Sequence, residues 1–214
     1  MRKVAVNSTA KIKRFVYAAS SSTYGDSPML PKVEGNEGNP LSPYAVTKLV
    51  NELYADVFSR VYGLHTIGLR YFNIFGPNQN PENPYAAVIP IFCKAFIDGV
   101  PPKINGDGNT SRDFTFVENA IQANIKAMLF ENLDKHEVMN VACGDQISLN
   151  EMIQMLNDVS KNSLTAEYGP ERQGDVKHSK ASIDKIKNIL GYNPEYRFKQ
   201  GLEIVYNWYK EIYS

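Results

Sequence analysis

The chain has 214 residues, of which 43% are hydrophobic and 21% charged, so it is long enough to bury a substantial core. Its 23 basic and 23 acidic side chains give a formal net charge of zero, which favours neither a nucleic-acid nor a membrane partner. No apolar run approaches the ~18 residues of a membrane span, and the first residues lack the apolar segment of a signal peptide. Cys93 and Cys143 are far apart and the three histidines are scattered, so we expect no metal site and two reduced, buried cysteines of a cytoplasmic protein.

The first predicted element is a short buried strand that ends in hydroxyl side chains. Residues 15–19 form an apolar run without a helical stripe, and Ser20, Ser21 and Ser22 follow it. Chemistry in open α/β sheets collects at the carboxyl ends of strands, where these hydroxyls could bind a substrate oxygen. The serines could equally satisfy the local backbone.

The next element is a helix predicted over residues 43–62. Ser42 is a good N-cap, and Pro43 fits the first helical position because its missing N–H costs nothing there. Tyr44 and Lys48 then lie one turn apart on the same face. A nearby ammonium favours the phenolate over the phenol and would make Tyr44 a usable base, although the two could also be an exposed pair on an ordinary helix.

The rest of the chain alternates strands and helices. A second strand and turn cover residues 66–76, and a Pro/Asn-rich loop follows. A strand is predicted at 137–142, and Ser148 with Glu151 forms a capping box at a helix start. The helices expected in this part cover residues 86–98, 116–133, 148–160, 182–190 and 199–212.

The order strand–serines, helix–Tyr/Lys, strand–Tyr-Phe-Asn resembles the extended short-chain dehydrogenase/reductase family, specifically its NAD-dependent nucleotide-sugar epimerases and dehydratases. The resemblance implies an α/β fold: a partial Rossmann domain with a doubly wound parallel sheet, and a smaller α/β substrate-binding lobe. We expect residues 1–75 to form the C-terminal part of the NAD-binding domain. Residues 76–214 are then the nucleotide-sugar-binding lobe, interleaved with returning Rossmann elements.

The glycine-rich turn of such a domain is absent from the sequence. No GxxGxxG-like segment precedes the serine strand, and residues 1–10 resemble the tail of the helix before that strand. Compared with the family, we therefore expect the first strands and the pyrophosphate-binding turn to be missing, as in a fragment or a truncated product. NAD is the cofactor that the resemblance implies, and we expect the purified chain to retain none.

The resemblance also implies the roles of individual residues. Ser20 would hydrogen-bond the 4-hydroxyl of a sugar, Tyr44 would remove its proton, and Lys48 would bind the nicotinamide ribose, with Phe72 walling the nicotinamide. Arg112 in SRDF and Arg172 with Asp175 in RQGD match UDP-binding motifs, although surface salt bridges are the alternative. The other implied substrate contacts are Ser21, Ser22 and Asn73 at the sugar or diphosphate, Ala87 and Val88 along the nucleotide, and Ile104 and Asn105 at the uracil.

Three serines indicate which reaction and which substrate of the family the chain favours. Ser21 and Ser22 stand where the dehydratases carry an Asp-Glu pair, and decarboxylases keep a glutamate at the second position, so simple 4-epimerisation is favoured. Ser179 stands where a small residue leaves room for a 2-acetamido group, although it could be an ordinary turn residue. The chain most resembles the UDP-N-acetylglucosamine 4-epimerases, with UDP-glucose and UDP-galactose as possible further substrates.

Two alternatives remain. A UDP-glucuronate 4-epimerase would need an additional cation for the carboxylate, which the sequence does not assign. A non-catalytic remnant that binds UDP-sugar, or a half that needs a partner chain, would explain intact arginines beside a missing glycine turn. Dimers of the family pair through two helices, of which the chain has one complete, so we expect a weakened homodimer.

Overall fold

Three parallel strands form the centre of the larger lobe. The structure, a computed structural model, describes residues 12, 14–82, 87–171 and 177–213. Strands β1 (Phe15–Ser20), β2 (Thr66–Tyr71) and β7 (Glu137–Val141) form a parallel sheet in the order β1-β2-β7. Ser20 pairs with Tyr71 and Tyr71 with Val141, so the three strands end together. This register brings the loops after all three strands to one edge of the sheet.

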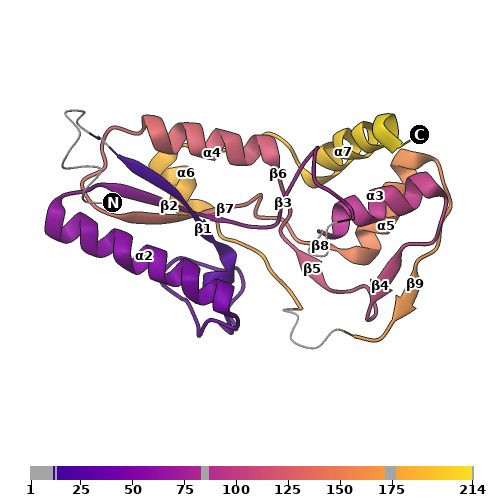
Figure 1. The fold of residues 1–214 in the computed structure, drawn as a ribbon, viewed down its shortest axis with the longest axis horizontal. Helices are drawn as coiled ribbons and strands as arrows, with labels where there is room; N and C mark the ends of the chain where they lie inside the picture. Colours follow the sequence, from indigo (N-terminus) through magenta and orange to yellow (C-terminus); the bar gives the residue numbers. More distant parts are fainter. Residues whose placement is uncertain (1–11, 13, 83–86, 172–176, 214) are drawn as a thin grey trace.

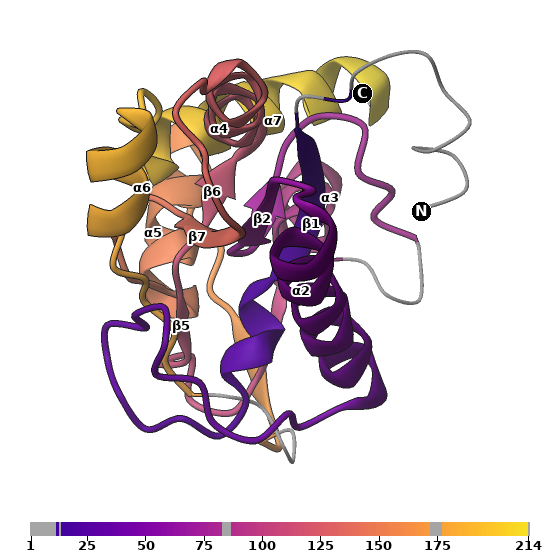
Figure 2. The same ribbon diagram turned by 90° about the vertical axis from the view of Figure 1, so that its left-hand side faces the viewer.

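Helices cover both faces of this sheet, which confirms the expected α/β class. Helix α2 (Pro43–Tyr62) packs on one face of β1 and β2, and α4 (Val117–Leu129) packs on the other, with α6 (Asp184–Leu190) beside it against β7 (Figure 2). The start of α2 is as predicted, because Ser42 Oγ accepts from the backbone N–H of Ala45 at 3.1 Å. Helix α4 ends earlier than predicted, since Asn132 and Asp134 are weak helix formers.

The second lobe is built on three helices and short strand pairs (Figure 1). Its helices are α3 (Val88–Asp98), α5 (Leu149–Ser160), which begins with the predicted capping box, and α7 (Phe198–Tyr213). They enclose a core with several aromatic rings, in which Cys93 is buried; Cys143 is also buried, and both cysteines are free. No helix in the described part of the chain is both long and apolar enough to cross a membrane. The strand pairs are β3 (Ile74–Phe75) with β6 (Thr115–Phe116), β4 (Lys103–Asn105) with β9 (Glu167–Gly169), and β5 (Ser111–Arg112) with β8 (Ile147–Ser148).

A long connection crosses the carboxyl ends of the strands. After β1 the chain forms the short 3-10 helix η1 (Ser21–Tyr24) and turns at Gly25, whose φ is 52°. A Cβ atom at Gly25 would lie 1.8 Å from the carbonyl oxygen of Asn39, so only glycine fits. Residues 25–42 then run past this edge to α2, and Lys32 forms a parallel bridge with Ala181. The connection therefore lies above the strand ends, where the site residues gather.

Candidate active site

Ser20 and Ser22 at the end of β1 hydrogen-bond to each other, and the hydroxyl proton of Ser20 is not used in these bonds. Ser20 caps η1, with its Oγ accepting from the backbone N–H of Ser22 at 3.2 Å and from the Ser22 hydroxyl at 2.9 Å. Ser20 is 9% exposed, and Ser21 and Ser22 are half-buried. Because Ser20 Oγ accepts both of these bonds, its own proton remains available to a substrate oxygen. The local-backbone role and the ligand role are therefore compatible.

The first turns of α2 present the Tyr-Lys pair. Lys48 Nζ donates to the carbonyl oxygen of Ala18 at 2.9 Å, which fixes the ammonium against β1. The same nitrogen lies 5.6 Å from the centroid of the Tyr44 ring. Tyr44 is 56% exposed, so its hydroxyl can meet a ligand. The helix thus places a base candidate and a cation together near the carboxyl end of β1.

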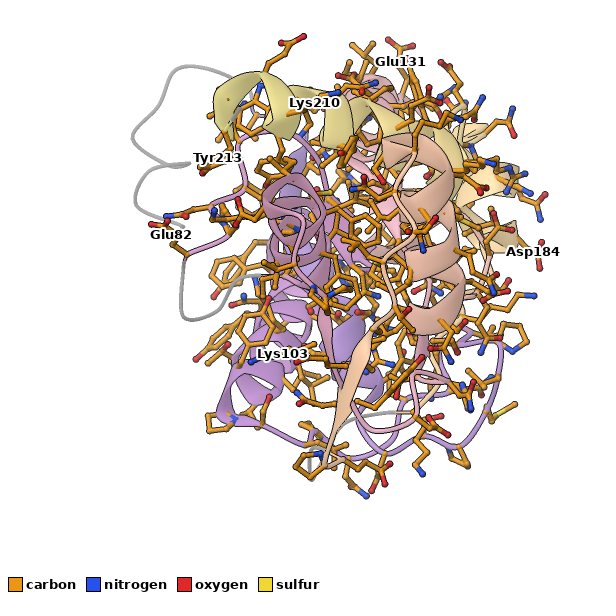
Figure 3. All side chains as sticks on the ribbon, turned by 90° about the vertical axis from the view of Figure 1, so that its right-hand side faces the viewer. Glu82, Lys103, Glu131, Asp184, Lys210 and Tyr213 are labelled. Carbon is orange, nitrogen blue, oxygen red and sulfur yellow. The ribbon has the colours of Figure 1, made fainter. Side chains whose placement is uncertain are left out.

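Two adjoining cavities open beside these residues. The serine cavity, of about 330 Å³, is lined by the serines after β1, by the connection to α2 and by Ser179. The α3 cavity, of about 380 Å³, is lined by residues of α3, β4 and β5, including Lys103 of β4, which is labelled in Figure 3. Asn73 and Arg112 line both cavities. Of the predicted substrate contacts, the serine cavity holds Ser21, Ser22 and Ser179, and the α3 cavity holds Ala87, Val88, Ile104 and Asn105.

The two residues at the junction are held by backbone groups. Arg112 Nη1 donates to the carbonyl oxygens of Ser111 at 2.9 Å and Lys177 at 3.2 Å. Asn73 has a positive φ of 37°, a conformation that asparagine tolerates, and its Nδ2 donates to the carbonyl oxygen of Asp113 at 3.0 Å. An anion at this junction would therefore meet a fixed guanidinium beside an exposed amide.

Asp113 of the same Arg-Asp-Phe motif is a structural residue that the sequence did not single out. Its carboxylate accepts from the backbone N–H groups of Cys143 at 3.0 Å, Gly144 at 3.0 Å and Ala181 at 3.2 Å. Burial raises the pKa of Asp113 to about 7, against the opposing effect of these hydrogen bonds. Asp113 joins the end of β7 to the segment that carries Ser179 and so supports the junction.

The predicted catalytic residues Ser20, Tyr44 and Lys48 line neither cavity. Three other predicted residues are buried elsewhere or not described. Phe72 is fully buried, packs 6.0 Å from the Tyr24 ring and lines neither cavity, so its contact with nicotinamide stays a prediction. Arg172 and Asp175 lie outside the described residues. Lys32 lines the serine cavity but was not predicted from the sequence, because it belongs to an irregular connection without a recognisable motif.

Comparison with models of protein families identifies the family of the chain. The model of the NAD dependent epimerase/dehydratase family matches residues 3–142. The chain belongs to this family. Among curated relatives of this family member, a putative UDP-glucose 4-epimerase of Methanocaldococcus jannaschii is 36% identical over 93% of the chain and 64% of the relative. A UDP-glucuronate 4-epimerase of Thermodesulfobacterium geofontis is 34% identical over 94% of the chain and 60% of the relative.

Solved structures of the family show the same fold. A UDP-N-acetylglucosamine 4-epimerase from Methanobrevibacter ruminantium, in complex with UDP-N-acetylmuramic acid, has a TM-score of 0.88 and 38% identity over 94% of the chain. A UDP-glucose 4-epimerase from Thermotoga maritima, with UDP-glucose, has a TM-score of 0.88 and 31% identity over 94% of the chain. The chain spans 64% and 65% of these two proteins, respectively.

The family is NAD-dependent, and related structures contain NAD. The donors near the end of β1 fit one end of this cofactor. Among the described residues, Lys48 Nζ has one hydrogen-bond acceptor, Ala18 O, so further N–H donors are left for ribose hydroxyls, with the exposed Tyr44 beside it. The sequence ahead of β1 contains no glycine-rich turn for the pyrophosphate. The donors of the described residues therefore fit the nicotinamide riboside end of NAD.

Proposed function

We propose that this chain is the catalytic and substrate-binding part of a cytoplasmic 4-epimerase that interconverts UDP-N-acetylglucosamine and UDP-N-acetylgalactosamine. The observation that carries the proposal is the pair of cavities joined at Asn73 and Arg112. In a UDP-sugar the diphosphate lies between the nucleoside and the hexose. Its site therefore needs a cation for the diphosphate, with a cavity for the nucleoside on one side and a polar cavity for the hexose on the other. In this proposal residues 1–75 carry the catalytic hydroxyls, and residues 76–214 bind most of the nucleotide.

The proposed mechanism assigns one task to each residue near β1. Ser20 donates its free proton to the 4-hydroxyl oxygen of the sugar, and Tyr44, as the phenolate, accepts the proton of that hydroxyl. Lys48 binds the nicotinamide ribose and stabilises the phenolate. When bound, NAD would serve as a reversible acceptor for the hydride of carbon 4. In this proposal the serine cavity would enclose the hexose and leave it room to present either face of carbon 4.

The choice of epimerisation rests on what the serine cavity offers. Ser21 and Ser22 line it where an eliminating enzyme of the family would need a carboxylic acid and a base. Ser179 lines the same cavity, and its backbone N–H donates to the carbonyl oxygen of Ser111 at 3.1 Å. A fixed, small residue there leaves space for a 2-acetamido group and also admits a 2-hydroxyl. UDP-glucose and UDP-galactose are therefore proposed as further substrates.

Conversion by the purified chain with added NAD tests the proposal. UDP-N-acetylglucosamine is incubated with the chain and excess NAD, and UDP-N-acetylgalactosamine is followed by chromatography. Tyr44→Phe keeps the ring near Lys48 but loses the acid-base hydroxyl, and should lower the rate by at least about 100-fold. Its affinity for UDP, measured by calorimetry, and its melting temperature should not change, because Tyr44 is 56% exposed and lines neither cavity.

The same experiment separates the epimerase from its alternative. UDP-sugar that binds but is not converted, even with excess NAD, would identify this chain as a non-catalytic binding remnant. Equal activity of Tyr44→Phe and the unaltered chain would remove Tyr44 from the mechanism. Release of NAD from the denatured chain measures separately whether the cofactor is retained on purification.

A further inference from the structure

A buried lysine lies in the wall of the serine cavity, outside the residues that the proposed mechanism uses. Lys32 is in the middle of the connection between η1 and α2 and lines the cavity together with Ser21, Ser22 and Ser179. Only 6% of its surface is exposed. Lysine is rarely buried to this degree unless its charge is paired, so its place beside a cavity needs an explanation.

The backbone of Lys32 is fixed from both sides. Its N–H donates to the carbonyl oxygen of Lys180 at 2.7 Å, and its own carbonyl oxygen accepts from the N–H of Ser182 at 2.9 Å and from Asn140 Nδ2 at 3.0 Å. These bonds tie Lys32 to the segment that follows Ser179. The lysine backbone therefore has a fixed position in the wall of the cavity.

Within the described ranges, the ammonium group of Lys32 has a single hydrogen-bond acceptor. Nζ donates to one acceptor, the carbonyl oxygen of Ser27, whereas an ammonium has three N–H donors. No carboxylate in the described ranges lies within ion-pairing distance of it. The acids nearest in sequence are engaged elsewhere, since Glu34 accepts from the N–H of Asn140 and Glu37 pairs with Arg70.

We propose that Lys32 is a specificity-determining residue that binds a carboxylate on the hexose of a UDP-sugar. The inference rests on the proposed function, because it assumes that the hexose occupies the serine cavity. One carboxylate oxygen would accept from Lys32 Nζ, and the hydroxyl of Ser21 in the same cavity is a donor for the other. Lys32 then supplies the additional cation that a uronate-accepting site requires.

An anion explains the site better than a neutral hydroxyl does. Burial lowers the pKa of Lys32, because water no longer solvates the ammonium fully. A neutral hydroxyl on the ligand would replace one hydrogen bond that the Lys32 ammonium lost with water, whereas a carboxylate would also compensate its positive charge. Arg112 lines both cavities, whereas Lys32 lines only the serine cavity of the two, so in this proposal the two cations meet two separate anionic groups of one ligand, the diphosphate and the carboxylate.

UDP-glucose and UDP-glucuronate test this proposal, since they differ only in whether carbon 6 is a hydroxymethyl or a carboxylate. Calorimetry should show about tenfold tighter binding of UDP-glucuronate to the unaltered chain, a ratio that shrinks at high salt. Lys32→Met keeps the aliphatic stem and should weaken UDP-glucuronate binding at least tenfold, with UDP and UDP-glucose changed less than threefold. Lys210→Met is the control at an exposed lysine of α7 (Figure 3). It should not change the affinity for UDP-glucuronate or for UDP-glucose.

The outcomes separate this inference from the proposed function. Equal affinities of the unaltered chain for the two sugars, or a Lys32→Met variant that loses both equally, would overturn the role of Lys32 while leaving the epimerase proposal intact. Failure of UDP itself to bind would instead contradict the UDP-sugar site. If Lys32→Met does not fold, as judged by circular dichroism, the ratio measured on the unaltered chain decides the question.

Discussion

At the scale of single residues, Asp113 supports the site without touching a ligand. Its three backbone donors come from the end of β7 and from the segment after Ser179. Asp113→Asn replaces one carboxylate oxygen by an amide N–H₂ group. That group would face the backbone N–H of Cys143 or Gly144, and a buried N–H would lose its acceptor. We expect the free energy of unfolding, measured by urea denaturation, to fall by about 3 kcal/mol.

A matched control for this prediction is available close by. Asp145 is half-buried, with 41% of its side chain exposed, and pairs with the exposed Arg197 at 3.1 Å. Asp145→Asn removes the same charge and should cost less than about 1 kcal/mol, because exposed ion pairs contribute little. If the two variants lost equal stability, the hydrogen bonds of Asp113 would not be what holds the end of β7 to the segment after Ser179.

At the scale of elements, a buried ion pair links β2 to α2. Arg70 is 4% exposed, and it donates to Glu52 of α2 from Nε at 2.9 Å and from Nη2 at 2.6 Å. Nη1 also pairs with Glu37 in the connection, and the guanidinium lies 4.8 Å from the centroid of the Tyr24 ring. One arginine thus holds the helix that carries the Tyr-Lys pair and the connection that carries Lys32.

Removing this arginine should be costly, because it leaves a carboxylate buried without a cation. Arg70→Met should lower the free energy of unfolding by about 3–5 kcal/mol, and adding Glu52→Leu should restore part of the loss. Arg60→Met is the control, since Arg60 pairs with Asp56 on the exposed side of α2. Urea denaturation of the three variants measures both effects, and a loss no larger than that of Arg60→Met would contradict the prediction.

Local signals predicted the long helices and the three strands of the central sheet, but not the short strand pairs of the second lobe. Helix α2 has the expected bounds because a capping serine and a proline fix its start and Gly63 in the left-handed region ends it. Lys32 and Asp113 could not be predicted in the same way. Their environments come from contacts with residues far along the chain, such as Ala181, and no local periodicity encodes those contacts. The predicted contacts that meet in the two cavities were found by family resemblance, which already contains that long-range information.

At the scale of the whole molecule, one strand edge and one helix face of the larger lobe are uncovered in the described chain. Strand β1 pairs only with β2, so its other edge has free backbone groups. Helix α2 also presents an apolar face to solvent. The exposed residues of that face recur at helical spacing and are Val46, Val50, Leu53, Val57 and Val61. Exposed apolar faces of this kind mark association surfaces.

We expect this face of α2 to mediate weak self-association of the chain. Sedimentation velocity should show a monomer–dimer equilibrium that depends on concentration, since one helix offers less buried area than the standard interface of ~1,600 Å². Leu53→Glu places a charge in the middle of the face and should give a monomer at all concentrations. Ile204→Glu, at a 41% exposed residue of α7 in the other lobe, should behave like the unaltered chain. A dimer that does not dissociate on dilution, or one that survives Leu53→Glu, would mean that a different surface pairs the chains.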